Sequence, residues 1–312
     1  MNDLIHVTSS PHVREKMDTR KIMLCVIISL LPATFFGIYN FGVKALLIIF
    51  LSIFTSVLSE WVFDRITYRK NTIGDLSAVV TGLLLGLNLP HTVSWFIPVL
   101  GSIFAIFIVK MLFGGLGQNF MNPALGARCF LVLSFASQMT TFTYDGVTGA
   151  TPLTQIKQGE TVNTIDMLLG TCGGTIGETS ALCLLIGGIF LILMGIISLR
   201  IPATYIITLV LFMGAFGPKG FDGTYLLQQV FGGGLMIGAF FMATDYVTCP
   251  ITPKGQIVYG IILGVLTGVF RVFGQTAEGV SYAIIFTNCL VPLIEKFTIP
   301  KAFGINTVKE EH

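Results

Sequence analysis

The sequence predicts an all-α polytopic membrane protein with about ten transmembrane helices. Of its 312 residues, 53% are hydrophobic and only 11% are charged, and its mean hydropathy is +0.83. A soluble domain has about 25% charged residues, more than twice the fraction found in this chain. A soluble enzyme, a disordered protein and a nucleic-acid-binding protein are therefore excluded.

Ten apolar segments are candidate spans, because a helix needs about 20 mostly apolar residues to cross a bilayer. They are residues 22–40, 43–63, 77–90, 93–113, 123–138, 180–199, 202–216, 226–244, 257–273 and 280–299. Three of them are short, and short or glycine-interrupted spans often line internal cavities. The ten-residue alternating pattern of a membrane barrel is absent, so we expect a helical bundle.

The distribution of Lys and Arg predicts the orientation. Residues 1–21 are mostly polar, so we do not expect them to act as a cleavable signal peptide. With the N-terminus in the cytoplasm, fourteen Lys and Arg residues fall on the inner side and four on the outer side. Basic residues gather in cytoplasmic loops, so both termini are predicted to be cytoplasmic. The expected division is a cytoplasmic segment 1–21, a five-span repeat 22–138, an extracytoplasmic loop 139–179, a second five-span repeat 180–299 and a cytoplasmic tail 300–312.

Two weak internal matches suggest that the halves are related. Gly117-Gln118-Asn119-Phe120 resembles Gly274-Gln275-Thr276-Ala277, and Pro90 and Pro250 each end a glycine-containing apolar run. With five spans in each half, the second copy would be inverted in the membrane. Inverted repeats place broken helices and a functional site near the bilayer midplane.

The most specific string lies in the predicted outer loop, at residues 145–153 (DGVTGATPL). One interpretation is a surface turn, because Asp-Gly, Thr-Gly and Thr-Pro are common in turns. The other is the D-x-x-[ST]-G-A-T signature for covalent flavin attachment, in which the last Thr, here Thr151, carries FMN through a phosphoester. Asp145 and Thr148 occupy the other defined positions, and Asp145 could order the turn or assist the flavin transferase.

The residues around Thr151 suit that modification. Gly149 and Ala150 add no bulk beside the Thr151 hydroxyl, so a modifying enzyme could approach the backbone there. Pro152 disfavours helical backbone at the residue before it.

Four strings carry a resemblance to a known family. They are SAVVTGLLLGLNLP (77–90), GGLGQNFMNPALGARCF (114–130), DGVTGATPL (145–153) and FMATDYVTCP (241–250). With them, residues 20–305 resemble the D subunits of Rnf complexes, which are ion-translocating ferredoxin:NAD oxidoreductases. The chain is also similar to the paralogous B subunits of sodium-pumping NADH:quinone reductases. Tyr246 stands where the family's ATDPV-type string has Pro.

The resemblance implies two flavins: covalent FMN on Thr151, facing away from the cytoplasm, and noncovalent riboflavin among the helices. Asn119 and Asn122 match the family's riboflavin ligands, and an amide can pair with both the donor and the acceptor edges of a flavin ring. The alternative is that these two Asn cap the following helix, which begins at Pro123.

Among the acidic residues, Asp245 is the candidate for an ion path. Asp245 ends an apolar run, and acids in or beside membrane spans often mark ion paths. The alternative is a helix-end carboxylate in an interfacial network. Glu60 and Asp64 lie on one helical face, but Arg65 is adjacent, so we interpret them as interface charges.

The sequence therefore predicts a translocase subunit of a prokaryotic plasma membrane. Electrons would pass between the FMN on Thr151 and riboflavin near Asn119 and Asn122, coupled to Na⁺ or H⁺ movement. NAD and ferredoxin should bind other subunits, because no Rossmann or Cys-rich segment is present. The expected partners are these membrane and peripheral subunits, a flavin transferase and lipid. No catalytic residue or metal site is predicted.

The main alternative function is an inverted-repeat channel or transporter for a small solute. A further alternative is a scaffold that only assembles other subunits.

Overall fold

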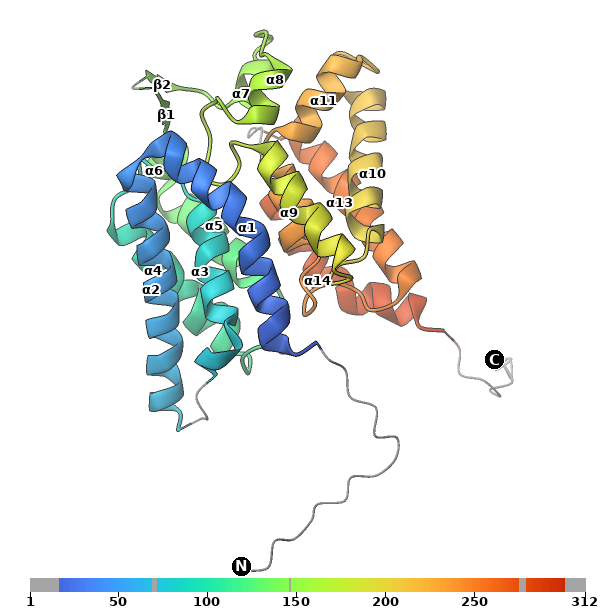
Figure 1. The fold of residues 1–312 in the computed structure, drawn as a ribbon. Coiled ribbons are helices and arrows are strands. Elements are labelled where there is room, and N and C mark those ends of the chain that lie inside the picture. Colours follow the sequence, from blue (N-terminus) through green and yellow to red (C-terminus); the bar gives the residue numbers. More distant parts are fainter. Residues whose placement is uncertain (1–16, 69–71, 146, 275–278, 301–312) are drawn as a thin grey trace, which may run out of the picture.

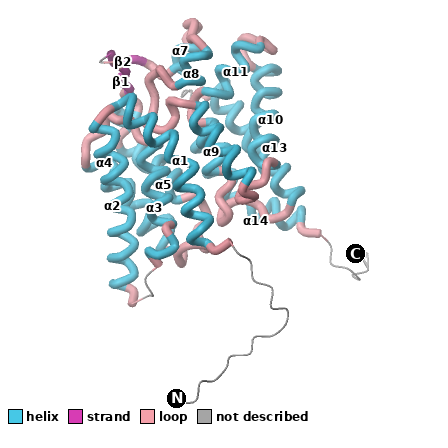
Figure 2. Tube along the Cα trace, viewed as in Figure 1, coloured by secondary structure: helices cyan, strands magenta, loops and turns pink. Residues whose placement is uncertain are grey.

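The computed structural model describes residues 17–68, 72–145, 147–274 and 279–300, and these form a bundle of helices with a short β-hairpin at one end (Figures 1 and 2). Part of the second repeat string, Gln275 to Ala277, lies outside the described residues. The predicted helical class is confirmed. The hairpin was not predicted.

The first half of the chain supplies six helical elements and a turn of 3₁₀-helix. They are α1 (Thr19–Phe41), α2 (Val43–Ile66), the 3₁₀ turn η1 (Ile73–Asp75), α3 (Ser77–Leu87), α4 (Phe96–Ile103) with its π-helical continuation η2 (Phe104–Met111), and α5 (Pro123–Ser134). Local sequence sets several ends: Asp18 accepts a hydrogen bond from the first amide of α1, and Pro123 opens α5.

A connecting region follows, and then the second half. The connection holds α6 (Ala136–Met139), β1 (Phe142–Tyr144), β2 (Val147–Gly149), α7 (Pro152–Lys157) and α8 (Thr164–Leu169). The second half holds α9 (Ala181–Leu193), α10 (Arg200–Phe216), α11 (Gly223–Phe231), α12 (Leu235–Ile237), the π-helical η3 (Gly238–Met242), α13 (Pro253–Phe273) and α14 (Val280–Thr298). Each of the ten predicted apolar segments is mainly helical.

Length divides these helices into two groups. Within the described residues, α1, α2, α13 and α14 are each long and apolar enough to cross a membrane. The pair formed by α11 and the α12–η3 segment would be a fifth span, bent by 63°. Gly233 and Gly234 make this break with φ of +64° and +66°, a backbone that favours glycine. Five shorter apolar helices complete the bundle, so ten crossings stay a prediction.

The tightest packing joins α10 to α13. Gly260, Gly264 and Gly268 lie one turn apart on α13, and they face Thr204, Thr208 and Phe212 on α10. A Cβ at Gly264 would lie 2.6 Å from the Cβ of Thr208. Small residues at this spacing allow two helix backbones to approach closely in a membrane protein.

Several charged side chains are buried in the bundle, contrary to our interpretation of Glu60 and Asp64 as interface charges. Glu60 is fully buried and Asp64 is 3% exposed. Glu60 receives a hydrogen bond from Lys110 at 2.9 Å, and Thr72 donates to both acids. The sequence interpretation was wrong because Lys110, 50 positions away on η2, supplies the compensating charge.

Candidate functional site

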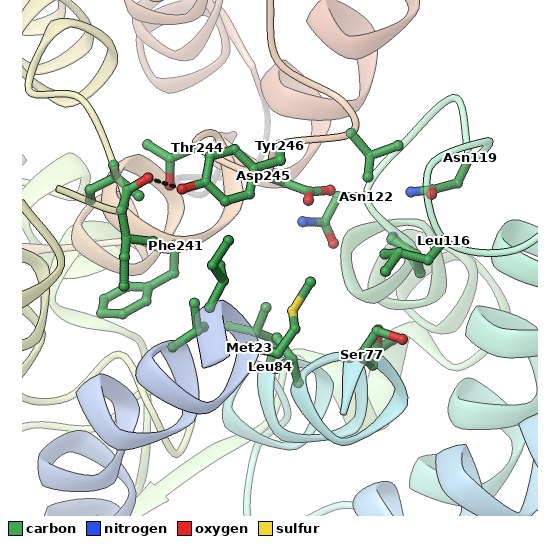
Figure 3. A pocket seen from close by; sticks show the side chains of 18 of the residues that line it. Met23, Ser77, Leu84, Leu116, Asn119, Asn122, Phe241, Thr244, Asp245 and Tyr246 are labelled. Carbon is green, nitrogen blue, oxygen red and sulfur yellow. Dashed lines mark hydrogen bonds between the residues drawn. The ribbon is translucent and has the colours of Figure 1, made fainter. Parts of the chain in front are cut away.

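A cavity lined by both halves of the chain, the central cavity, brings together three of the predicted site residues, Asn119, Asn122 and Asp245. About 750 Å³ of space lies between its walls, counting the open mouth. Side chains from α1, α3, η2, α5, α9 and η3 line it, together with the segments that precede α5 and follow α9 and η3. In Figure 3 the labelled polar side chains face the same open space as Met23, Leu84 and Phe241.

Asn122 has the capping role that was one of its two predicted alternatives. Its Oδ1 accepts hydrogen bonds from the amides of Ala124 at 3.0 Å and Leu125 at 3.4 Å. Its Nδ2 donates to the carbonyl of Met242 at 3.4 Å. Asn122 thus holds the start of α5 against the end of η3 while its side chain borders the cavity.

Asn119 does not cap α5. Its Nδ2 donates to the carbonyl of Met121 at 3.1 Å, and its Oδ1 has no hydrogen-bond partner among the described residues. The residue is 6% exposed. A buried polar atom without a partner costs about 1–3 kcal/mol, so this atom is suited to a donor from a ligand in the cavity.

Asp245 lies in the turn after η3 and borders the cavity. Its Oδ2 accepts a hydrogen bond from Thr248 at 3.2 Å, and its carbonyl accepts from the amide of Cys249. The next residue, Tyr246, is the one that departs from the family string. Its hydroxyl donates to the carbonyl of Ile196 (Figure 3), which ties this turn to the segment after α9.

Sequence analysis missed Lys110 and Ser77, which also line the cavity. The Lys110 ammonium donates to the Ser77 hydroxyl at 2.6 Å and to Glu60. Lys110 lies on η2, and π-helical segments are frequent at functional sites. A lysine inside an apolar run could have signalled this position, because unpaired charge is costly within a span.

The β-hairpin carries the start of the predicted flavin motif at the end of the bundle where α1 ends and α2 begins (Figure 1). Tyr144 pairs with Val147 across its turn. Asp145 is exposed in that turn with φ of +50°, a conformation that Asp adopts more readily than most residues. Asp145 thus occupies the turn, as its turn-ordering alternative requires. The backbone of Thr148 lies in β2, and its side chain is outside what the structure describes.

Thr151 follows the hairpin and immediately precedes α7. Its backbone is extended, with φ of −62° and ψ of 154°, as Pro152 predicts. No described atom lies within 4 Å of a Cβ built at Gly149, and Ala150 is exposed. Thr151 itself is only 7% exposed. Its hydroxyl is 2.9 Å from that of Thr154, because α7 turns inward and buries Leu153 and Ile156.

Two pockets adjoin the residues around Thr151. A smaller one, of about 330 Å³, is lined by Thr151, Glu178 and the glycines at 173–174 and 232–233. A larger, more open one, of about 810 Å³, is lined by Gly149, Ala150 and Tyr144 among others. Cys172 borders both pockets. Burial and the nearby Asp166 and Glu178 raise the pKa of the Cys172 thiol to about 12, so it is protonated at neutral pH.

The two sites lie far apart along the helix axes. At the end of α1, Asn40 donates to the carbonyl of Gly170, beside the pockets around Thr151. At its start, Met23 lines the central cavity. The intervening stretch of helix is about 25 Å long. Within the described ranges, no group of three His, Cys, Asp or Glu side chains has the arrangement of a metal site.

Comparison with known proteins finds relatives that align with nearly the whole chain. The D subunit of the Na(+)-translocating ferredoxin:NAD(+) oxidoreductase complex from Acetobacterium woodii is 47% identical over all of this chain and 99% of its own length. The D subunit of the proton-translocating ferredoxin:NAD(+) oxidoreductase complex from Clostridium ljungdahlii is 42% identical over 97% of both chains. The D subunit of the ion-translocating oxidoreductase complex from Yersinia pseudotuberculosis is 33% identical over 96% of this chain and 98% of its own. The NQR2, RnfD, RnfE family matches residues 6–304, and this chain belongs to that family.

Proposed function

We propose that this chain is a membrane electron-transfer subunit of an ion-translocating ferredoxin:NAD oxidoreductase complex. It would carry covalent FMN on Thr151 and riboflavin in the central cavity. The placement of Thr151 carries the proposal: the last residue of a flavin-attachment motif faces a pocket at one end of the bundle. The relatives named as D subunits of such complexes support it, because they align with the chain over almost their full length.

The residues near Thr151 fit a flavin phosphoester. The Thr151 hydroxyl would form the ester, Gly149 and Ala150 leave space beside it, and the larger pocket offers Tyr144 and Phe142 as an aromatic wall. FMN would supply one-electron and two-electron redox chemistry there. The protein's part is to hold the group at a fixed place and to set the charges around it.

The residues that line the central cavity suit a second, noncovalent flavin. Asn119 Oδ1 would accept a hydrogen bond from the ring, while apolar side chains such as Leu84 and Phe241 would cover its faces. Asn122 is already used as a cap, so it would position the wall of the cavity more than it would bind the ring. This proposal therefore gives the two Asn different roles, whereas the resemblance implied that both are riboflavin ligands.

We further propose ten crossings with the flavin loop outside a prokaryotic plasma membrane. Three of the counted basic residues, Lys110, Arg128 and Arg271, are buried and not in loops. Without them the counts are twelve inside and three outside, so the bias remains. Large apolar side chains exposed on α1 and α2, such as Phe35, Phe50 and Phe54, would contact lipid. The packing of α1 on α9 and of α5 on α14 pairs corresponding helices of the two proposed repeats.

The coupled ion is Na⁺ or H⁺. Two close relatives are named for different ions, although they are 47% and 42% identical to this chain. Asp245 is the proposed ion-path residue, because its carboxylate borders the cavity where riboflavin would be reduced and oxidised. A cation passing there would gain a negative partner that offsets part of its dehydration cost.

The test is ultraviolet fluorescence of the denatured chain on a gel, after expression with a flavin transferase. We expect the native chain and Thr154→Val to fluoresce, and Thr151→Val to be dark. Valine has nearly the shape of threonine but no hydroxyl. Thr151→Val therefore removes the oxygen that would form the ester, and Thr154→Val does not. Thr154 is the matched control because its hydroxyl contacts that of Thr151. Fluorescence in Thr151→Val would show that the attachment site is wrong.

A further inference from the structure

A buried ion pair lies next to the pocket under Thr151. Glu178 lines that pocket, and its Oε1 lies 3.4 Å from a guanidinium nitrogen of Arg128 on α5. The same nitrogen of Arg128 donates to the hydroxyl of Ser281 at 2.7 Å and to Oδ1 of Asn88 at 3.4 Å. Residues from α5, α14, the C-terminal cap of α3 and the segment before α9 therefore meet at one guanidinium.

Polar contacts continue from this pair to the central cavity. Nδ2 of Asn88 lies 3.9 Å from the sulfur of Met242, and the Met242 carbonyl accepts a hydrogen bond from Asn122. Asn122 borders the cavity. Asn122 caps the helix that carries Arg128, and the six-residue separation corresponds to about 9 Å along that helix. Arg128 is thus between the two candidate flavin sites, and Glu178 is on the side nearer Thr151.

The backbone around the pair leaves room for the carboxylate. A Cβ at Gly234 would collide with Oε1 of Glu178, and the φ of Gly234 is +66°. The side chains of Arg128 and Glu178 are only 10% and 6% exposed. Charges in such surroundings are screened weakly, so their fields reach neighbouring groups.

We propose that Arg128 and Glu178 are positioning residues that set the relative reduction potentials of the two flavin sites. This inference rests on the function proposed above. In each transfer one electron leaves one site, which is oxidised, and enters the other, which is reduced. The charge of Arg128 favours an electron at both sites. The charge of Glu178 opposes it mainly at the Thr151 site, so the pair favours the electron in the central cavity.

Potentiometric titration of both flavins in the purified full-length chain tests the assignment. Glu178→Gln removes a negative charge with little change of shape, so the potential of the Thr151-linked flavin should rise and that of the cavity flavin should change less. Arg128→Gln removes a positive charge, so both potentials should fall. A change on the order of tenfold in the equilibrium constant is expected for each charge, or ~59 mV for a one-electron couple.

Two further variants separate charge from structure. Arg128→Lys keeps the positive charge but not the planar guanidinium, so both potentials should stay close to those of the native chain. Ser281→Ala removes an uncharged partner of Arg128, and it should leave the potentials unchanged. Because Glu178→Gln is nearly isosteric, it tests the proposal even if Arg128→Gln does not fold.

Unchanged potentials in Glu178→Gln, with both flavins bound, would overturn the inference. So would shifts of the same sign in Glu178→Gln and Arg128→Gln. The native chain in the same preparation tests the proposed function separately: absence of covalent flavin there would overturn that function, and this inference with it.

Discussion

At the scale of single residues, two asparagines in one motif have different roles. The capping role of Asn122 follows from the sequence, because Asn followed by Pro is a local helix-start signal. The unpartnered oxygen of Asn119 could not be predicted in this way, since it depends on how the segment before α5 lies against the cavity. The burial of Thr151 was likewise hidden, because it results from the inward turn of α7.

We expect Asn119→Leu and Asn122→Leu to have separable effects. Asn119→Leu should lower the riboflavin content, since it removes a hydrogen bond to the ligand of about 0.5–1.5 kcal/mol. Asn122→Leu should mainly lower stability, by about 0.5–2 kcal/mol for a lost cap. Flavin extraction followed by chromatography measures the first effect, and thermal unfolding in detergent measures the second. Unchanged riboflavin in Asn119→Leu would remove Asn119 from the ligands, and both variants should keep the Thr151 adduct.

At the scale of helices, hydropathy predicted where the elements lie but not which faces meet. The glycines of α13 are spaced for close packing, yet only the structure shows that Thr204, Thr208 and Phe212 of α10 receive them. Buried charge was equally hard to predict. Glu60 is adjacent in sequence to apolar residues, and its partner Lys110 is on another helix.

Gly264→Ala should destabilise the α10–α13 contact. The added methyl group would lie 2.6 Å from the Thr208 Cβ and 2.9 Å from the backbone nitrogen of Leu209, so a helix must move. We expect a loss of about 1–3 kcal/mol, as for other overpacked sites. Gly223→Ala is the matched control, because its new Cβ would meet no described atom within 4 Å. Equal unfolding temperatures for the two variants would contradict this account of the packing.

At the scale of the whole molecule, composition correctly predicted a helical membrane protein, and all ten apolar segments contain helix. It could not predict that the segments at 119–122 and at Asp245, far apart in the chain, would border one cavity. That arrangement arises from the packing of α14 against both α5 and η3, and from the hydrogen bond between Asn122 and Met242. The resemblance of sequence strings does not reveal this shared cavity, because the cavity depends on how the helices pack.

Asp245→Asn should weaken ion-coupled turnover while both flavins stay bound. Asparagine keeps the size and the contact with Thr248 but removes the charge. If Na⁺ is coupled, the variant should need a higher Na⁺ concentration; if H⁺ is coupled, its dependence on pH should change. The measurement is ferredoxin-dependent NAD reduction by the assembled complex, with ion uptake into vesicles. Unchanged rates and ion dependence would make Asp245 a structural charge.

The most direct test of the central claim is the intact mass of the chain purified from its native membrane, together with the flavin released on denaturation. The account predicts a mass greater than the polypeptide by one FMN less one water, with the increment located on the peptide that contains Thr151. It also predicts one equivalent of free riboflavin per chain. A chain with the mass of the bare polypeptide, and no flavin released, would contradict the claim that this protein transfers electrons.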